Sequence, residues 1–217
     1  MDKVVEAAVI SRYGNAGQVC ICNEMVMVDE SIADEFAERV VERARQIRVG
    51  DPMTDVDMGP TVTRTGLDRV IDAVNQNVEQ GAELLLGGKV PEGEYFERGN
   101  WLEPTILYDV QPDGATVADE LFGPVMPITK ISGYEEALAR TIAREEGLSA
   151  YLWTNDYRTM IQAINHLETG TIFINQAITG QIQGYHTGHK TSGMGGEDGV
   201  HGIENYLQKK TIYLNHG

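Results

Sequence analysis

The first segment of the sequence that could do chemistry is residues 15–20, which read Asn-Ala-Gly-Gln-Val-Cys. A cysteine thiolate is a nucleophile, and a preceding glycine lets backbone amides approach a bound oxygen atom. The flanking pattern predicts that a helix ends near Gly14 and a strand begins near Met25, so Cys20 would lie on a loop that projects into a cleft. Taken alone, a cysteine is more often a small buried apolar residue, and we keep that interpretation for Cys22.

The second segment places a carboxylate and an aromatic ring, Glu120 and Phe122, directly before an apolar stretch predicted to be a strand at residues 125–131. Taken alone, this segment is best explained as a helix-to-strand connection closed by Gly123-Pro124. A chemical role for either side chain therefore depends on the context that the other segments provide.

The third segment, residues 176–199, contains seven glycines. Such a density is typical of a tight loop that approaches a ligand or another backbone. A flexible linker is the other explanation, but a linker would not carry one Tyr, two His and one Lys between residues 184 and 190. A phosphate-binding loop is not favoured, because Gly193-Met194-Gly195 follows no strand and lacks the dinucleotide fingerprint.

Alternating helices and strands must position these three segments. Apolar periodicity predicts helices near residues 4–13, 32–47, 67–78, 134–144, 157–167 and 203–207. It predicts strands near residues 25–28, 83–86, 105–107, 125–131, 149–153, 171–175 and 211–214. Strand–helix–strand alternation with these lengths predicts an α/β fold, with an open, mostly parallel sheet covered by helices on both faces and a C-terminal β arm.

Composition limits the classes of function. At 217 residues the chain can bury one sizeable core, and its 33 acidic against 17 basic residues give a net charge of −16. A nucleic-acid-binding protein would show the opposite sign, so that class is not favoured. The acidity is explained either by an ordinary soluble surface or by adaptation to a high-salt cytoplasm, where screening makes dense charge tolerable.

No apolar run in the sequence reaches the length of a membrane span, and residues 1–12 lack the apolar core of a secretory signal. We therefore expect a cytoplasmic protein without a membrane partner. Cys20 and Cys22 are too few and too close together for a disulfide framework. No cluster of His or Cys completes a metal site around them, so no metal is predicted.

Four motifs, in their order and spacing, resemble those of the catalytic (C-terminal) domain of the aldehyde dehydrogenase superfamily. They are Gly17-Gln18-Val19-Cys20 (the nucleophile motif), Glu120-x-Phe122-Gly123-Pro124 (the coenzyme-ribose motif), Gly170-Thr171-x-x-x-Asn175 (a strand that ends beside the active site) and Lys190-x-Ser192-Gly193-x-Gly195-x-Glu197-x-Gly199 (the C-terminal signature). The resemblance covers essentially the whole chain. It implies a thiol-bearing catalytic domain over residues 1–200, and a C-terminal helix and oligomerisation strand over residues 201–217.

Two features qualify the resemblance. Residues 183–188 and 195–199 are most similar to lactaldehyde and glycolaldehyde dehydrogenases. The family usually has Arg where Met25 stands, and residues 185–189 replace its common Pro-Phe-Gly-Gly. These departures leave the chemistry intact, but they leave the aldehyde substrate open.

The resemblance implies a role for six residues. The Cys20 thiolate would attack a small (hydroxy)aldehyde, and NAD or NADP would accept a hydride, which leaves a thioester on Cys20 for hydrolysis to the acid. Glu120 would bind the nicotinamide ribose, and Phe122 would lie beside the nicotinamide. The remaining three are Asn175 and Glu197, which would orient the base or relay its proton, and His186, which would line the aldehyde pocket. Apart from Cys20, these residues are also explained as ordinary loop residues with satisfied polar groups.

Similar enzymes carry a coenzyme-binding domain and a Glu-Leu-Gly-Gly segment, with the general base, ahead of this region. We expect both to be missing from this chain, through a truncated reading frame, a split gene or a cloned domain, and we expect the isolated chain to have negligible activity. Two alternatives stay open. One is an inactive remnant, or one subunit of a split enzyme that needs a partner coenzyme domain; the other is an acyl-CoA-forming or phosphate-reducing relative, which Glu197 makes less favoured. A homo-oligomer is expected.

Overall fold

The computed structural model describes residues 1–177 and 180–217, and its centre is a four-stranded sheet. The strands are β1 (Val26–Asp29), β2 (Glu83–Leu86), β3 (Thr105–Tyr108) and β4 (Val125–Ile131), in the order β1-β4-β3-β2. The β1–β4 and β3–β4 pairs are parallel, whereas β2 runs antiparallel to β3. We call residues 2–131, which include this sheet, the main lobe.

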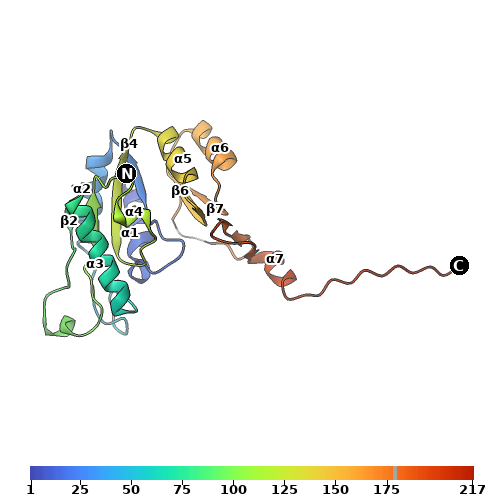
Figure 1. Ribbon diagram of the computed structural model, residues 1–217, viewed down its shortest axis with the longest axis horizontal. Helices are drawn as coiled ribbons and strands as arrows, with labels where there is room; N and C mark the ends of the chain where they lie inside the picture. Colours follow the sequence, from blue (N-terminus) through green and yellow to red (C-terminus); the bar gives the residue numbers. More distant parts are fainter. Residues whose placement is uncertain (178–179) are drawn as a thin grey trace.

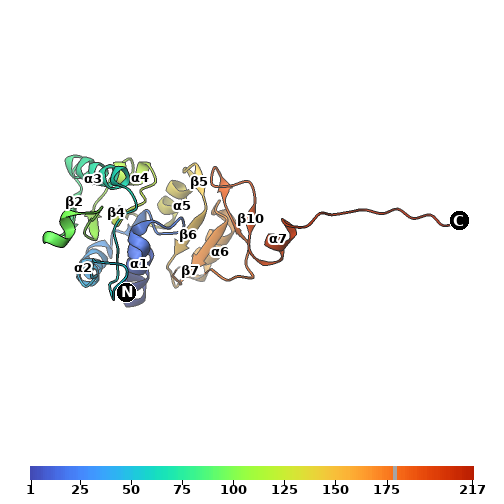
Figure 2. The same ribbon diagram turned by 90° about the horizontal axis from the view of Figure 1, so that it is seen from below.

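Helices cover both faces of the main-lobe sheet (Figures 1 and 2). On one face lie α1 (Asp2–Tyr13) and α2 (Ala33–Ala44), and on the other lie α3 (Arg64–Glu79) and the short α4 (Ala115–Ala118). Two 3₁₀ turns, η1 (Gly14–Gly17) and η2 (Glu94–Glu97), complete the lobe.

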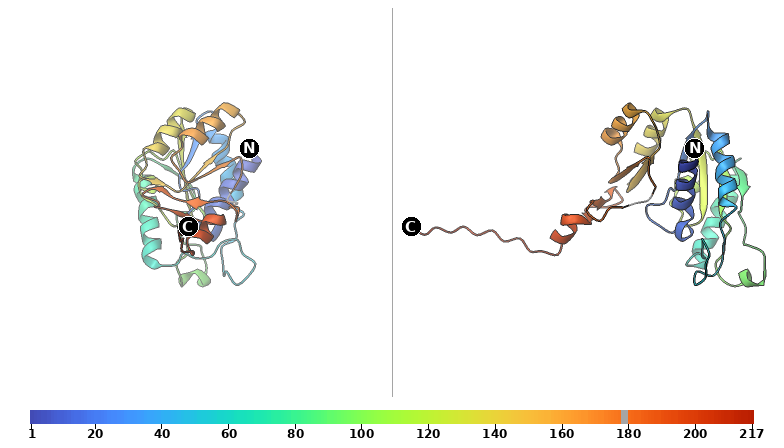
Figure 3. Two further views of the ribbon diagram at one scale, coloured as in Figure 1. Left: turned by 90° about the vertical axis from the view of Figure 1, so that its right-hand side faces the viewer. Right: turned by 180° about the vertical axis from the view of Figure 1, so that it is seen from behind.

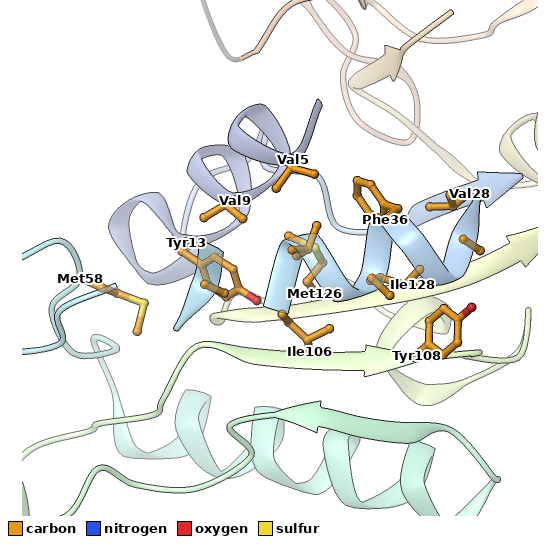
Figure 4. Close-up of a cluster of buried hydrophobic side chains, with 14 of the residues drawn as sticks. Val5, Val9, Tyr13, Val28, Phe36, Met58, Ile106, Tyr108, Met126 and Ile128 are labelled. Atoms are coloured by element: carbon orange, nitrogen blue, oxygen red, sulfur yellow. The ribbon is translucent and has the colours of Figure 1, made fainter. Parts of the chain in front are cut away.

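Alternation along the central strands explains these layers. In β3, Ile106 packs into the cluster formed with α1 and α2, and the next residue, Leu107, packs into the cluster formed with α3. In β4, Ile128 and Val125 divide in the same way. Figure 4 shows the first cluster, with Ile128 among the side chains that α1 and α2 cover. Central strands buried on both faces read as continuous apolar runs, as these two do.

A second, smaller lobe follows in the chain, and we define it as residues 134–174. It contains α5 (Tyr134–Ile142), β6 (Ser149–Leu152), α6 (Tyr157–His166) and β7 (Thr171–Ile174). The strands β6 and β7 form a parallel pair, with Ser149 opposite Thr171 and Leu152 opposite Ile174. This pair is a separate sheet from that of the main lobe.

Two short antiparallel pairs hold the glycine-rich segment. The strand β5 (Glu146–Gly147) pairs with β9 (His189–Lys190), and β8 (His186–Thr187) pairs with β10 (Gly196–Glu197). The helix α7 (Gly199–Glu204) follows, and the rest of the chain extends away from both lobes (Figures 1 and 3).

The predicted α/β class with mostly parallel strand pairing is confirmed, with three differences. The strands are divided between two main sheets, because neither β1 nor β6 is paired along its second edge within the described part of the chain. The last helix spans Gly199–Glu204 rather than residues 203–207. Residues 211–214 form no strand and are exposed, because they pair with no strand among the described residues. The C-terminal β arm is therefore not formed in this chain. Among the described helices, none is long and apolar enough to span a membrane.

Candidate active site

The loop that carries Cys20 begins with an unusual backbone turn. Asn15, Ala16 and Gly17 have φ angles of 51°, 55° and 71°, so three consecutive residues adopt the left-handed conformation. Ala16 is buried, and an alanine in this conformation is strained by about 1–2 kcal/mol. Side chains of Asn15 and Gln18 brace the turn through hydrogen bonds to each other's carbonyl oxygens, of 3.0 and 3.1 Å. Backbone strain of this kind is concentrated at functional sites, and Cys20 lies only three residues after Gly17.

The two cysteines differ in environment. Cys20 is exposed, whereas Cys22 is partly buried. The Cys22 thiol receives a hydrogen bond from Nη1 of Arg12 at 3.2 Å, and its Sγ lies 3.6 Å from the Gly17 carbonyl oxygen. Burial raises the pKa of the Cys22 thiol, and the nearby Arg12 charge offsets only part of that rise. A thiol that resists ionisation is a poor nucleophile, so Cys20 is the better candidate of the two.

The loop of Cys20 touches the loop of Glu120 and Phe122. A Cβ atom added to Gly17 would lie 2.1 Å from the Gly123 carbonyl oxygen, so only glycine permits this approach. The first two predicted segments, more than 100 residues apart in the sequence, are therefore direct neighbours.

The 120–123 loop presents two side chains to solvent from a fixed backbone. Glu120 is exposed and Phe122 is 44% exposed, although Leu121 and Gly123 on either side of Phe122 are buried. An exposed aromatic ring between buried residues is available to a flat ligand, and the exposed carboxylate can accept hydrogen bonds from hydroxyl groups.

A cavity of about 890 Å³ lies between the two lobes, and Cys20 and Glu120 both line it. Its walls come from α1, β1, α5 and β6, and Ser192 of the glycine-rich segment also reaches it. Tyr151 of β6 donates a hydrogen bond of 2.6 Å to the carbonyl oxygen of Ile21, the residue between the two cysteines. The second lobe is thereby fastened directly to the cysteine loop.

Asn175 follows β7, and its φ angle of 54° is left-handed. Its side-chain amide donates to the Thr154 carbonyl oxygen at 2.8 Å and accepts from the Thr154 amide at 3.0 Å. The Asn175 side chain thus extends the β6–β7 ladder by one residue. It does not line the cavity, although the next two residues, Gln176 and Ala177, do.

His186 and Glu197 stand opposite each other in the β8–β10 pair. His186 is partly buried, Glu197 is exposed, and neither lines the cavity with Cys20. The structure thus places the six predicted residues in three groups: Cys20 with the Glu120–Phe122 loop, His186 with Glu197, and Asn175 at the end of β7. Among the described residues, no three His, Cys, Asp or Glu side chains are grouped as they would be around a metal ion.

A model of the aldehyde dehydrogenase family matches residues 1–212 of this chain. The chain belongs to that family. It is 42% identical over 217 residues to the 3,6-anhydro-alpha-L-galactose dehydrogenase of Vibrio sp. (strain EJY3), a match that covers 99% of the chain and 45% of that relative. It is 36% identical to the lactaldehyde dehydrogenase of Escherichia coli (strain K12), over 99% of the chain and 44% of that relative.

Solved structures give the same result for the fold. The structure of 3,6-anhydro-L-galactose dehydrogenase in complex with NAP is similar to the chain with a TM-score of 0.94 at 40% identity, covering 99% of the chain and 45% of its own length. The Escherichia coli lactaldehyde dehydrogenase structure gives a TM-score of 0.91 at 37% identity, covering 98% and 44%. The chain therefore spans about 45% of the length of the relatives it matches, and the family uses NAD or NADP.

In this member of the aldehyde dehydrogenase family, residues 190–199 of the C-terminal signature make structural contacts with the second lobe. The Lys190 ammonium donates to the carbonyl oxygens of Ile142 and Arg144 at 2.7 and 2.9 Å, just beyond the end of α5, and forms an ion pair with Glu168. The Ser192 hydroxyl accepts from the Gly147 amide at 2.9 Å. Cations at the C-terminal end of a helix are stabilising, so the signature fixes the second lobe next to the cavity.

Three residues of the site, Arg12, Glu24 and Tyr151, were not predicted from the sequence. Arg12 lies seven residues after Val5 and three after Val9, on the buried face of α1. A charged residue on an apolar helix face was a usable signal. Glu24 and Tyr151 gave no comparable signal, because their partners, the Leu121 amide and the Ile21 carbonyl, are backbone groups distant in sequence.

Proposed function

We propose that this chain is the thiol-bearing catalytic portion of an NAD(P)-dependent aldehyde dehydrogenase that oxidises a small (hydroxy)aldehyde to the acid. One observation carries the proposal: the loop of the exposed Cys20 is held against the loop that presents Glu120 and Phe122, at the edge of one large cavity. A nucleophile on a strained loop beside an exposed aromatic ring suits an aldehyde held next to a flat coenzyme ring.

In the proposed reaction, the Cys20 thiolate adds to the aldehyde carbon and forms a thiohemiacetal. Hydride loss from that carbon converts the thiohemiacetal to a thioester, and water then releases the carboxylic acid and the free thiol. The backbone amide of Cys20 would donate a hydrogen bond to the oxyanion formed in the first step. Each step needs Cys20 accessible, as the structure has it.

The coenzyme, when bound, would supply the hydride acceptor. Glu120 would accept hydrogen bonds from its ribose hydroxyls, and Phe122 would contact its nicotinamide ring. Both side chains are exposed on a loop whose neighbouring residues are buried, which fits a planar, hydroxyl-bearing group.

The supporting roles of the other predicted residues are also proposals. Asn175 would act by fixing the turn that brings residues 176 and 177 to the cavity. His186 and Glu197 would act as a pair, His186 on the aldehyde side and Glu197 in proton relay. We further propose a cytoplasmic protein that works as a homo-oligomer or with a coenzyme domain.

The alternative is a protein that shares the fold but has no chemistry of its own, either a remnant or one subunit of a split enzyme. The chain's 45% share of its relatives' length keeps that alternative in place. Thiol chemistry separates the proposal from an inert remnant, because a nucleophile can be assayed without coenzyme.

The experiment is acylation of the purified chain by p-nitrophenyl acetate. A competent Cys20 should release one equivalent of p-nitrophenolate in a burst and become acetylated, as peptide mass spectrometry would show. Cys20→Ser should abolish the burst, and Cys22→Ser, the matched control, should retain it. A chain that is acetylated equally at both cysteines, or at neither, would refute Cys20 as an activated nucleophile.

A further inference from the structure

We propose that Arg12 is a positioning residue that fixes the distance between the loop of Cys20 and Cys22 (the cysteine loop) and the Glu120–Phe122 loop. It does so through simultaneous hydrogen bonds to both loops, which we call the Arg12 grip. The proposal rests on the proposed function for its chemical meaning, because those loops are the ones assigned to the nucleophile and the coenzyme. The grip itself rests on geometry alone.

The Arg12 side chain is almost completely buried, with 1% of its surface exposed, and it lies at the end of α1. Its Nη2 donates to the carbonyl oxygens of Leu121 and Gly123, at 2.9 and 2.7 Å. Its Nη1 donates to the thiol of Cys22 at 3.2 Å. One guanidinium therefore holds the backbone on both sides of Phe122 and, at the same time, the residue two positions after Cys20.

Glu24 forms a further hydrogen bond to the same loop. Its carboxylate accepts a hydrogen bond from the Leu121 amide, so both backbone polar groups of Leu121 are bound by side chains from the cysteine region. Burial raises the pKa of Glu24, and the Leu121 amide and the Arg12 charge offset part of that rise. The 121–123 backbone is thus fixed by an acceptor and a donor of opposite charge.

A lysine could not replace this arrangement. A guanidinium offers five donors in a rigid plane, whereas an ammonium is a compact point charge on a flexible stem. Arg12 binds both carbonyl oxygens through Nη2 and the thiol through Nη1, so all three acceptors are held by two of its nitrogen atoms. Hydrogen bonds from an ionised donor are also about twice as strong as neutral ones, which is what offsets burial of the charge.

The consequence for function concerns distance. Phe122 is presented by a loop that has no regular structure of its own, and Cys20 lies on another such loop. If either loop moved by about 1 Å, the aldehyde carbon and the hydride acceptor would no longer be aligned, and such errors cost rate steeply. Arg12 joins the two loops, so they move together.

Tyr13 provides a matched control within the same turn of α1. Its buried hydroxyl donates a hydrogen bond of 2.9 Å to the Thr105 carbonyl oxygen of β3, and not to the 120–123 loop. Tyr13→Phe therefore removes a buried hydrogen bond from the same helix end and leaves the grip in place.

The test is native-state hydrogen exchange, read by mass spectrometry on the full 217-residue chain, for Arg12→Met, Arg12→Lys and Tyr13→Phe. We expect exchange of the Leu121 and Gly123 amides to rise at least about tenfold in both Arg12 variants, with β4 amides rising no more than in Tyr13→Phe. Loss of packing alone would raise exchange in β4 and the loop by one common factor. Loop protection at the wild-type level in either Arg12 variant, or a rise shared equally with β4, would overturn the proposal. If Arg12→Met does not fold, Arg12→Lys carries the test.

A second readout uses the alkylation rate of Cys22 against pH in a Cys20→Ser background. Removing the Arg12 charge should move the pH midpoint upward in Arg12→Met and leave it in place in Arg12→Lys, whereas simple unpacking would lower it toward that of a free thiol. A lowered midpoint in Arg12→Met would count against the grip. Neither readout uses Cys20, so failure of the grip and failure of the acylation test are separate results.

Discussion

In the main lobe every residue of β3 is buried, whereas in the second lobe no residue of β6 is. The helices differ in the same way: α2 buries five residues and α5 buries none, although both have an apolar face. The cause is the number of neighbours. β3 is paired on both edges and covered on both faces, while β6, within the described residues, is paired with β7 alone.

The difference teaches that a local pattern decides which face of an element is apolar, but not whether that face is covered. Ala137 and Leu138 of α5 line the cavity between the lobes instead of a packed core. We therefore expect the main lobe to supply the stability of the chain, and the second lobe to be held mainly by polar ties. Trp101 in the main lobe and Trp153 beside β6 are the two tryptophans of the chain, so each lobe has its own fluorescence reporter.

The largest expected effect is from core truncation. Ile128→Ala removes a fully buried side chain between the sheet and the helices α1 and α2, and should lower the free energy of unfolding by about 2–5 kcal/mol. Leu152→Ala in β6, where the side chain borders the cavity, should cost clearly less and should affect Trp153 more than Trp101. Urea unfolding followed by fluorescence measures both, and equal losses in the two variants would contradict the comparison.

The next largest effect should come from the contact between Gly17 of the cysteine loop and Gly123 of the 120–123 loop, since both loops belong to the main lobe. Gly17→Ala should destabilise the chain by about 1–3 kcal/mol, because its φ is 71° and the new Cβ would meet the Gly123 carbonyl oxygen. Gly14→Ala is the control: its φ is −55° and nothing lies within 4 Å, so it should be neutral or stabilising by up to about 1 kcal/mol. Differential scanning calorimetry of both variants would decide, and similar melting temperatures would mean that the loops are not in contact.

The hydrogen bond from Tyr151 to the Ile21 carbonyl, which joins the two lobes, should contribute less to stability, and its contribution should depend on pH. Burial raises the pKa of Tyr151 to about 12. The native state therefore keeps a proton that the unfolded chain loses near pH 10, and stability should fall as pH rises from about 10 to 12. Tyr151→Phe should cost about 0.5–1.5 kcal/mol at pH 7 and lessen the alkaline decline seen at Trp153. An unchanged alkaline decline would place its origin elsewhere.

Salt should give the smallest effect. A net charge of −16 repels itself at long range, and screening relieves that repulsion, whereas the ion pairs of the chain are mostly exposed and contribute about 0–1 kcal/mol each. Melting temperature should therefore rise modestly between low salt and molar NaCl. A flat or falling curve would remove the high-salt interpretation of the acidity.

Much of this architecture could be predicted from local patterns, because apolar periodicity gave the helices and strands of both lobes. The family could be predicted as well, and so could the close approach that requires glycine at residue 17. The division into two sheets could not, because strand pairing depends on partners far along the chain. Residues 211–214 illustrate the same limit: their alternating pattern predicts a strand, but they pair with no other strand of the described residues and form none.

The hydrogen bond from Tyr151 to the Ile21 carbonyl has a mechanical consequence. It acts as a tether between a lightly packed lobe and the peptide unit beside Cys20. Movement of the second lobe relative to the main lobe would therefore be transmitted through this hydrogen bond to the backbone next to Cys20. The fluorescence lifetime of a dye attached at Cys20 would then change when the second lobe moves relative to the main lobe.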